Sequence, residues 1–214
     1  MNNLRKTTFL TIFSVTIIFI LKFIGTASPN FFSNPDLAVL FSIITIIASF
    51  IVILFFVFFY FDFVEFHQTG LRFSTKLMLI SSSLMSLLYI YKFAGFFYDI
   101  HSLRMYYFDI LSLMIPVVYS VSMLIFFIFF FIEALPGDLI KLRRSTTIVI
   151  TATSFISVLK LIQFFSFIHF ERTQNVQTMI DISIIGVPFI LLEFGALVNF
   201  FKIFYKLLKQ DYWY

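Results

Sequence analysis

The sequence predicts an all-α, polytopic transmembrane helical bundle with about six spans, built as three tandem helical hairpins, with both termini cytoplasmic. Two observations predict the spans. Of 214 residues, 61% are hydrophobic and only 12% are charged, and the apolar residues are gathered into six long runs. A soluble domain has about 45–50% apolar and about 25% charged residues. A soluble chain of this length could not cover so many apolar side chains, so lipid is the expected solvent.

Each of the six runs is close to the ~20 residues that an α-helix needs to cross a hydrocarbon core of about 30 Å. A β-barrel would instead need strands of about ten residues with alternating apolar and polar side chains. The run Ile51–Phe61 has no such alternation. The expected spans, in chain order, are Thr7–Ile24, Ala38–Phe61, Leu77–Phe97, Ile110–Ile132, Thr147–Ile168 and Ile182–Phe201.

The basic residues predict the orientation of these spans, because cytoplasmic loops are enriched in Lys and Arg. Ten of the fifteen basic residues fall on one side of the predicted membrane. That side is therefore expected to be cytoplasmic, and the membrane to be a bacterial plasma (inner) membrane. The ten are Arg5, Lys6, Arg72, Lys76, Lys141, Arg143, Arg144, Lys202, Lys206 and Lys209.

The first span has an alternative interpretation as a cleaved signal peptide. Arg5 and Lys6 precede its apolar stretch, which ends near the small residues Gly25, Thr26 and Ala27, and this is the order found in secretory signals. The internal repeat described next favours a retained helix.

The three odd-numbered spans open with similar residues, namely Leu4–Thr8, Leu71–Thr75 and Leu142–Thr146. In each, a basic residue is followed sixteen positions later by a lysine, which is Lys22, Lys92 or Lys160. Sixteen residues of helix rise about 24 Å, so each lysine is expected near the outer edge of the hydrocarbon. The pattern predicts a single transmembrane domain, 1–214, made of hairpins at approximately 1–70, 71–141 and 142–214, all with the same orientation.

The second and third hairpins share more than their openings. Ile-His and a following Arg recur as His101 with Arg104 and as His169 with Arg172, and a helix proline follows as Pro116 or Pro188. The first hairpin lacks the His, the outer Arg and the proline. We therefore regard it as the divergent member.

The outer residues of the hairpins form a candidate binding site or ion pathway. In one interpretation the lysines extend to lipid headgroups and the other charges pair at helix ends. In the other, the cations line an outward-facing vestibule that attracts an anion, and the histidines exchange protons near neutral pH. The candidate residues are Lys22, Lys92, His101, Arg104, Lys160, His169 and Arg172.

A metal site at the same end is a weaker alternative. His101 and His169 could supply imidazoles, with Asp99 or Glu171 adding a carboxylate. No pair has the i, i+4 spacing of a helix-borne zinc motif. We therefore predict no metal, no cofactor and no catalytic residue.

Glu193 is the acid expected to lie deepest in the membrane, within Leu191–Gly195 on the last span. An intramembrane carboxyl suggests proton or cation handling. The alternative is a protonated or hydrogen-bonded carboxyl that only packs against a neighbouring helix.

The sequence thus favours transport- or channel-type handling of a small solute or ion, by the chain alone or as the membrane subunit of a complex. The second class is a non-catalytic structural or assembly subunit, and the third is a membrane-embedded enzyme that uses His101, His169 and nearby acids. The expected partners are the lipid bilayer and, beyond it, membrane-protein subunits or further copies of the chain. Nucleic acid is not expected, because the basic residues lie where the membrane would place them.

Overall fold

The computed structural model describes residues 2–27, 35–95, 106–137, 139–173 and 177–209, and no side chain is described at 22, 25–27, 106–109, 169–173 or 177–186. Within these ranges the chain is helical apart from two short connections. The helices are α1 (Asn2–Ala27), α2 (Pro35–Asp62), α3 (Thr69–Ala94), α4 (Tyr106–Phe129), a π-helical turn η3 (Phe130–Ala134), α5 (Ile140–Thr173) and α6 (Gln177–Lys209).

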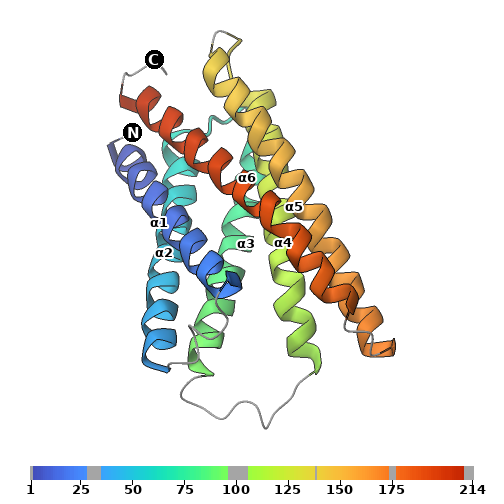
Figure 1. Ribbon diagram of the computed structural model, residues 1–214. Helices are drawn as coiled ribbons and strands as arrows, with labels where there is room; N and C mark the ends of the chain where they lie inside the picture. The colour runs from blue at the N-terminus through green and yellow to red at the C-terminus, as the bar shows by residue number, and fades with distance from the viewer. Residues whose placement is uncertain (1, 28–34, 96–105, 138, 174–176, 210–214) are drawn as a thin grey trace.

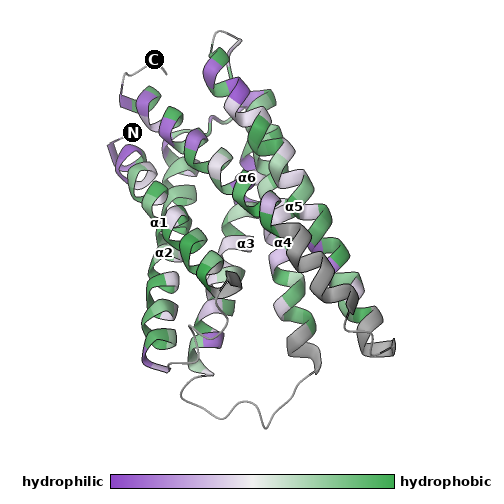
Figure 2. Ribbon diagram, in the orientation of Figure 1, coloured by the Kyte–Doolittle hydropathy of each residue, from purple (hydrophilic) through white to green (hydrophobic). Residues whose placement is uncertain are grey.

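The six long helices form a closed ring, because each packs against the next in sequence and α6 packs back against α1 (Figure 1). All six are long and apolar enough to cross a membrane, which confirms the predicted number of spans. Large apolar side chains such as Phe13, Ile47, Leu87 and Phe165 are exposed on their outer sides, and Figure 2 shows hydrophobic colour along most of the described helices. The architecture fits an integral, multi-pass membrane protein.

Both termini lie at one end of the ring, together with the α2–α3 and α4–α5 connections (Figure 1). We call this the terminal end and the other the opposite end. At the terminal end, Arg72 donates a hydrogen bond from Nε to the hydroxyl of Tyr60 at 2.9 Å. Arg143 lies 4.6 Å from the ring centre of Phe131. Two of the arginines used to predict orientation are therefore held against aromatic rings.

The odd-numbered helices begin with the same local arrangement. Leu4, Leu71 and Leu142 are each at most 1% exposed. Four residues later a threonine hydroxyl donates to the leucine carbonyl, at 2.7 Å for Thr8, 2.7 Å for Thr75 and 2.8 Å for Thr146. These hydroxyls are satisfied within their own helix, so they can be buried without a partner from another helix.

The even-numbered helices fill the centre of the terminal half with nine buried phenylalanines, three from each helix or its π-turn. We call this the aromatic cluster. Its members are Phe55, Phe56, Phe59, Phe126, Phe127, Phe130, Phe200, Phe201 and Phe204. The sequence pattern is Phe-Phe-x-x-Phe in all three cases.

The third phenylalanine of each set forms a triangle around the middle of the ring. The ring centres of Phe59 and Phe130 are 5.9 Å apart, those of Phe130 and Phe204 5.9 Å, and those of Phe59 and Phe204 6.1 Å. The three helices thus contribute equivalent rings to one contact.

The first two phenylalanines of each set form a cycle of edge-to-face contacts. The separations are all close to 5 Å and the interplanar angles close to a right angle, which is a favoured geometry for aromatic pairs. The pairs are Phe56–Phe126 (5.1 Å, 88°), Phe127–Phe200 (4.9 Å, 87°) and Phe55–Phe201 (5.1 Å, 90°).

The π-turn η3 fixes the start of α3. The carboxylate of Glu133 accepts hydrogen bonds from the backbone N–H of Gly70 at 3.0 Å and of Leu71 at 2.8 Å. Gln68 donates from its side chain to the Glu133 carbonyl at 3.1 Å. A carboxylate at a helix N-terminus satisfies otherwise unpaired N–H groups and complements the helix dipole.

Gly70 has no side chain, which leaves room for the Glu133 carboxylate to reach the start of α3. We therefore expect Gly70→Ala to destabilise the bundle. An added Cβ would overlap the ring of Phe129 and the Glu133 carboxylate. Overpacking of this kind costs about 1–3 kcal/mol. Thermal unfolding in detergent should show a lower midpoint for Gly70→Ala and an unchanged one for Gly137→Ala, because Gly137 has open space around its Cα. Equal midpoints for the two variants would contradict the packing described here.

Candidate functional site

A cavity of about 60 Å³ lies inside the ring. Three hydroxyl-bearing helices contribute to its wall, with Ser49 from α2, Ser82 and Tyr89 from α3, and Tyr119 from α4. The rest of the wall is apolar and comes from Ile18, Val52 and Met85. Four hydroxyl-bearing residues thus contribute to a small pocket whose wall is mostly apolar.

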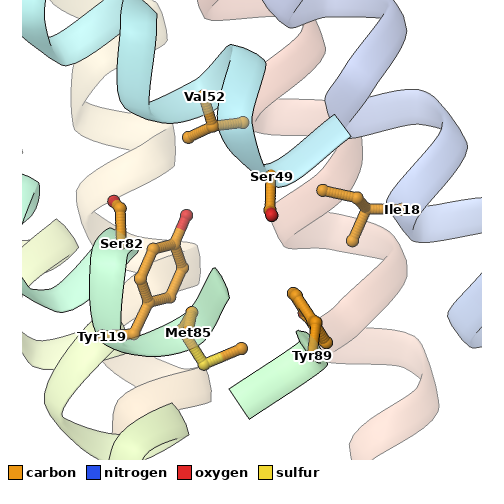
Figure 3. Close-up of a pocket in the computed structure, with 7 residues that line it drawn as sticks. All are labelled: Ile18, Ser49, Val52, Ser82, Met85, Tyr89 and Tyr119. Carbon is orange, nitrogen blue, oxygen red and sulfur yellow. The ribbon is translucent and has the colours of Figure 1, made fainter. Parts of the chain in front are cut away.

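The hydroxyls of Ser49 and Tyr119 point into the space between the helices, with Val52 above and Met85 below them (Figure 3). Ser49 accepts a hydrogen bond of 2.9 Å from the hydroxyl of Ser86, which joins α2 to α3 beside the cavity. Ser82 is 3% exposed, and its Oγ makes no hydrogen bond within the described part of the chain. A buried hydroxyl of this kind is normally satisfied by water or a ligand.

The helix register places this site beyond the aromatic cluster, toward the opposite end. Tyr119 and Glu193 each precede the first phenylalanine of their set by seven residues, and Ser49 precedes its own by six. At 1.5 Å per residue, the site lies about 10 Å from the cluster along the helices. The ring is therefore filled by aromatic side chains on one side of the site.

Glu193 lies next to this site. It is half-buried on α6, and its Oε1 atom is shielded from solvent. Tyr119, which lines the cavity, is close enough to Glu193 and to Tyr89 for electrostatic interaction with both. The neighbouring Phe194 stacks on Phe19 of α1 with ring centres 4.0 Å apart, which fixes this turn of α6 against α1. Tyr119 thus joins the cavity to the carboxyl that the sequence singled out.

Further buried hydroxyls lie on α5, at the two positions of that helix that correspond to Ser82 and Ser86. Counted from the buried leucine that opens each helix, Thr153 matches Ser82 and Ser157 matches Ser86. Both side chains are at most 5% exposed, and neither hydroxyl is hydrogen-bonded within the described residues. Buried hydroxyl groups therefore lie on α5 as well as on the helices that line the cavity.

The predicted outer vestibule is only partly visible. Lys92 is exposed in the last turn of α3, and Lys160 is half-buried on α5. Lys22, His169 and Arg172 lie on described helices, but their side chains are outside the described set, and His101 and Arg104 lie outside the described residues altogether. Among the predicted site residues whose side chains the structure describes, Glu193 is the one associated with the cavity. The vestibule stays a prediction.

No motif in the sequence singles out Ser49, Ser82, Tyr89 or Tyr119. Single serines and tyrosines inside apolar runs are common in transmembrane helices, so none stands out by itself. The signal that could have found them is the threefold Phe-Phe-x-x-Phe pattern, because it sets a common register in which Tyr119 and Glu193 occupy the same position.

Within the described ranges, no group of three His, Cys, Asp or Glu side chains could hold a metal ion. The metal alternative centred on His101 and His169 falls on side chains outside that set. Comparison of the chain with models of protein families, with curated proteins and with solved structures found no match. The interpretation of the site therefore depends on its geometry.

Proposed function

We propose that this protein performs transport- or channel-type handling of a small solute or ion, and that the cavity beside Glu193 is the place where the solute binds. The observation that supports this is a hydroxyl-lined cavity next to a shielded carboxyl, inside helices that are apolar enough to span a bilayer. Polar and ionisable groups at such depth are costly, and in membrane proteins they mark substrate and ion pathways. Sites near the middle of the bilayer are typical of transporters.

The aromatic cluster indicates from which end of the ring a solute reaches this site. Nine buried phenylalanine rings fill the terminal half, and a packed apolar constriction excludes water and ions. We propose that the cluster is the closed gate of the pathway. The solute then reaches the cavity from the opposite end in the conformation described.

We also propose that the chain is three tandem hairpins, at about 1–70, 71–141 and 142–214, related by an axis along the membrane normal. The three buried leucines with their threonine hydrogen bonds and the cyclic phenylalanine contacts support this proposal. With the positive-inside rule, they suggest a cytoplasmic terminal end and an outward-facing cavity.

Reaction of an introduced thiol with an impermeant reagent tests the site. The native chain has no cysteine, so Ser82→Cys gives a single thiol in the cavity, and Leu87→Cys gives a control on the exposed side of the same helix. In oriented proteoliposomes, Ag⁺, a thiol-reactive ion small enough for the cavity, should label Ser82→Cys from the opposite end only. In the same preparation, labelling should block the currents that follow concentration jumps of H⁺, Na⁺, K⁺ or chloride.

Two results would contradict the proposed function. The first is an absence of current above that of protein-free liposomes for every ion tested, and the second is a current that labelling of Ser82→Cys leaves unchanged. The first result, combined with co-purification of a fixed set of membrane proteins, would favour the structural-subunit class.

Orientation is tested separately in intact cells. Thr69→Cys places a thiol at the start of α3 and Gly137→Cys places one in the α4–α5 connection, both at the terminal end, where both native residues are exposed. We expect an impermeant maleimide to leave both unlabelled until the membrane is permeabilised. Labelling in intact cells would show that the terminal end faces outward, opposite to the proposed orientation.

A further inference from the structure

The size of the cavity limits what it can hold. Pockets for drug-sized organic ligands have volumes of about 300–1,000 Å³, whereas this cavity measures about 60 Å³. A buried site needs roughly 10–15 Å³ for each water molecule. The cavity can therefore hold a few water molecules or one small ion, and organic solutes are too large for it.

The groups around the cavity limit its chemistry further. Ca²⁺ takes about six to eight oxygen ligands, and Mg²⁺ takes a near-octahedral set of about six that includes one or two carboxylates and several waters. Glu193 is the single carboxyl associated with this cavity among the described side chains. The hydroxyls of Ser49, Ser82 and Tyr119 can each both donate and accept hydrogen bonds. Such groups order water and bind both forms of a protonating carboxyl.

We propose that the ligand of this site is the proton, that cavity water carries it, and that Glu193 holds it. In the step we infer, a hydronium ion in the cavity transfers its proton to the Glu193 carboxylate, which leaves a neutral water molecule and a carboxylic acid. In the same step Tyr119, which interacts electrostatically with Glu193 in the structure, is the hydrogen-bond donor that positions the ionised carboxyl. This inference depends on the proposed function, because it identifies the ion handled at the same site.

Other titratable and charged groups lie on the helices around Glu193. Two of them are the phenol groups of Tyr119 on α4 and Tyr89 on α3. On the two helices packed against α6, the basic residues beyond this level toward the opposite end are Lys160 of α5 and Lys22 of α1. An ammonium group near the carboxylate would favour its ionised form. Variants of both lysines are therefore included in the experiment.

Labelling with dicyclohexylcarbodiimide tests the inference without a transport assay. This apolar reagent adds to a carboxylic acid only when the acid is protonated, and the adduct is located by mass spectrometry of the full-length protein in detergent. We expect Glu193 labelling to increase at least about tenfold as the pH falls from about 9 to about 6, because the reagent needs the protonated acid and burial favours the neutral form of a carboxyl. Glu193→Gln should lack this adduct, and the exposed Glu65 supplies an internal reference.

The Tyr119→Phe variant tests the positioning role. Loss of a hydrogen bond to the ionised carboxyl favours the protonated form, so the midpoint of Glu193 labelling should shift to higher pH. An unchanged midpoint would contradict the role of Tyr119. The variant retains the aromatic ring, so packing is preserved.

Three results would overturn the proton assignment. Protection of Glu193 by Na⁺ or K⁺ at fixed pH would show a metal-cation site instead. Labelling that appears only in Lys22→Met or Lys160→Met would show an ion-paired structural carboxyl. An absence of labelling at every pH in a folded protein would show that Glu193 does not protonate. None of these results would by itself remove the currents expected in proteoliposomes. The proton assignment and the proposed transport function can therefore fail independently.

Discussion

Replacement of Glu193 by glutamine is expected to reduce the ion currents of reconstituted protein to those of protein-free liposomes, while the variant still accumulates in the membrane. Glutamine nearly preserves the shape of the side chain but cannot ionise, and the carboxyl lies beside the cavity with its Oε1 shielded. A group that must gain and lose charge during each cycle cannot be replaced by a neutral one. The measurement is the current after a pH jump, normalised to the amount of reconstituted protein.

Two control variants test whether the loss of current is specific to the carboxyl of Glu193. Glu65→Gln changes an exposed acid in the α2–α3 connection and should leave the current unchanged. Glu193→Asp retains a carboxyl and should retain part of the current. If Glu193→Gln lowers the amount of folded protein and the current in equal proportion, Glu193 has a packing role and the proposed pathway is wrong.

Truncation of any one ring in the central triangle is expected to give the largest loss of stability. Phe59, Phe130 and Phe204 are each at most 1% exposed and each contacts the other two. In soluble proteins, Phe→Ala at a core position costs about 3–5 kcal/mol. Because the contacts are equivalent, the three alanine variants should lower the thermal unfolding midpoint in detergent by similar amounts.

Phe50→Ala and Phe73→Ala are the matched controls, since both rings are exposed on the outer surface. They should change the midpoint little. A large loss for one triangle position with no loss at the other two would contradict the threefold arrangement. Variants that remain folded should also pass ions in both directions without a pH dependence, because the opened cluster would no longer exclude water.

The helices could be predicted from sequence because the membrane imposes simple requirements on them. A run such as Ala38–Phe61 is long, apolar and without alternation, and it falls within α2. At most of their ends the helices extend several residues beyond the predicted spans, because the chain continues as helix beyond the hydrocarbon. Thr147–Ile168, for example, lies inside the longer Ile140–Thr173. Composition cannot locate such ends, because helix continues in water as well as in lipid.

The candidate site could be predicted only in part. Glu193 stood out because a carboxyl in an apolar run is rare, but the direction in which Tyr119 and Ser82 point depends on how the helices pack. The lysine spacing was also an imperfect guide to the register. Counted from the buried leucines, Lys22 and Lys160 occupy the same position, whereas Lys92 lies three residues further along its helix.

The internal hydrogen bonds of Thr8, Thr75 and Thr146 bear on how the protein is assembled. Each hydroxyl is satisfied by its own helix, so each helical hairpin can enter the bilayer separately without leaving these polar groups unpaired in hydrocarbon. Association of the inserted hairpins then depends on side-chain packing rather than on a hydrophobic driving force. Insertion and association become separate steps, and ring closure must wait for α6, which is made after the other five helices, to reach both α5 and α1.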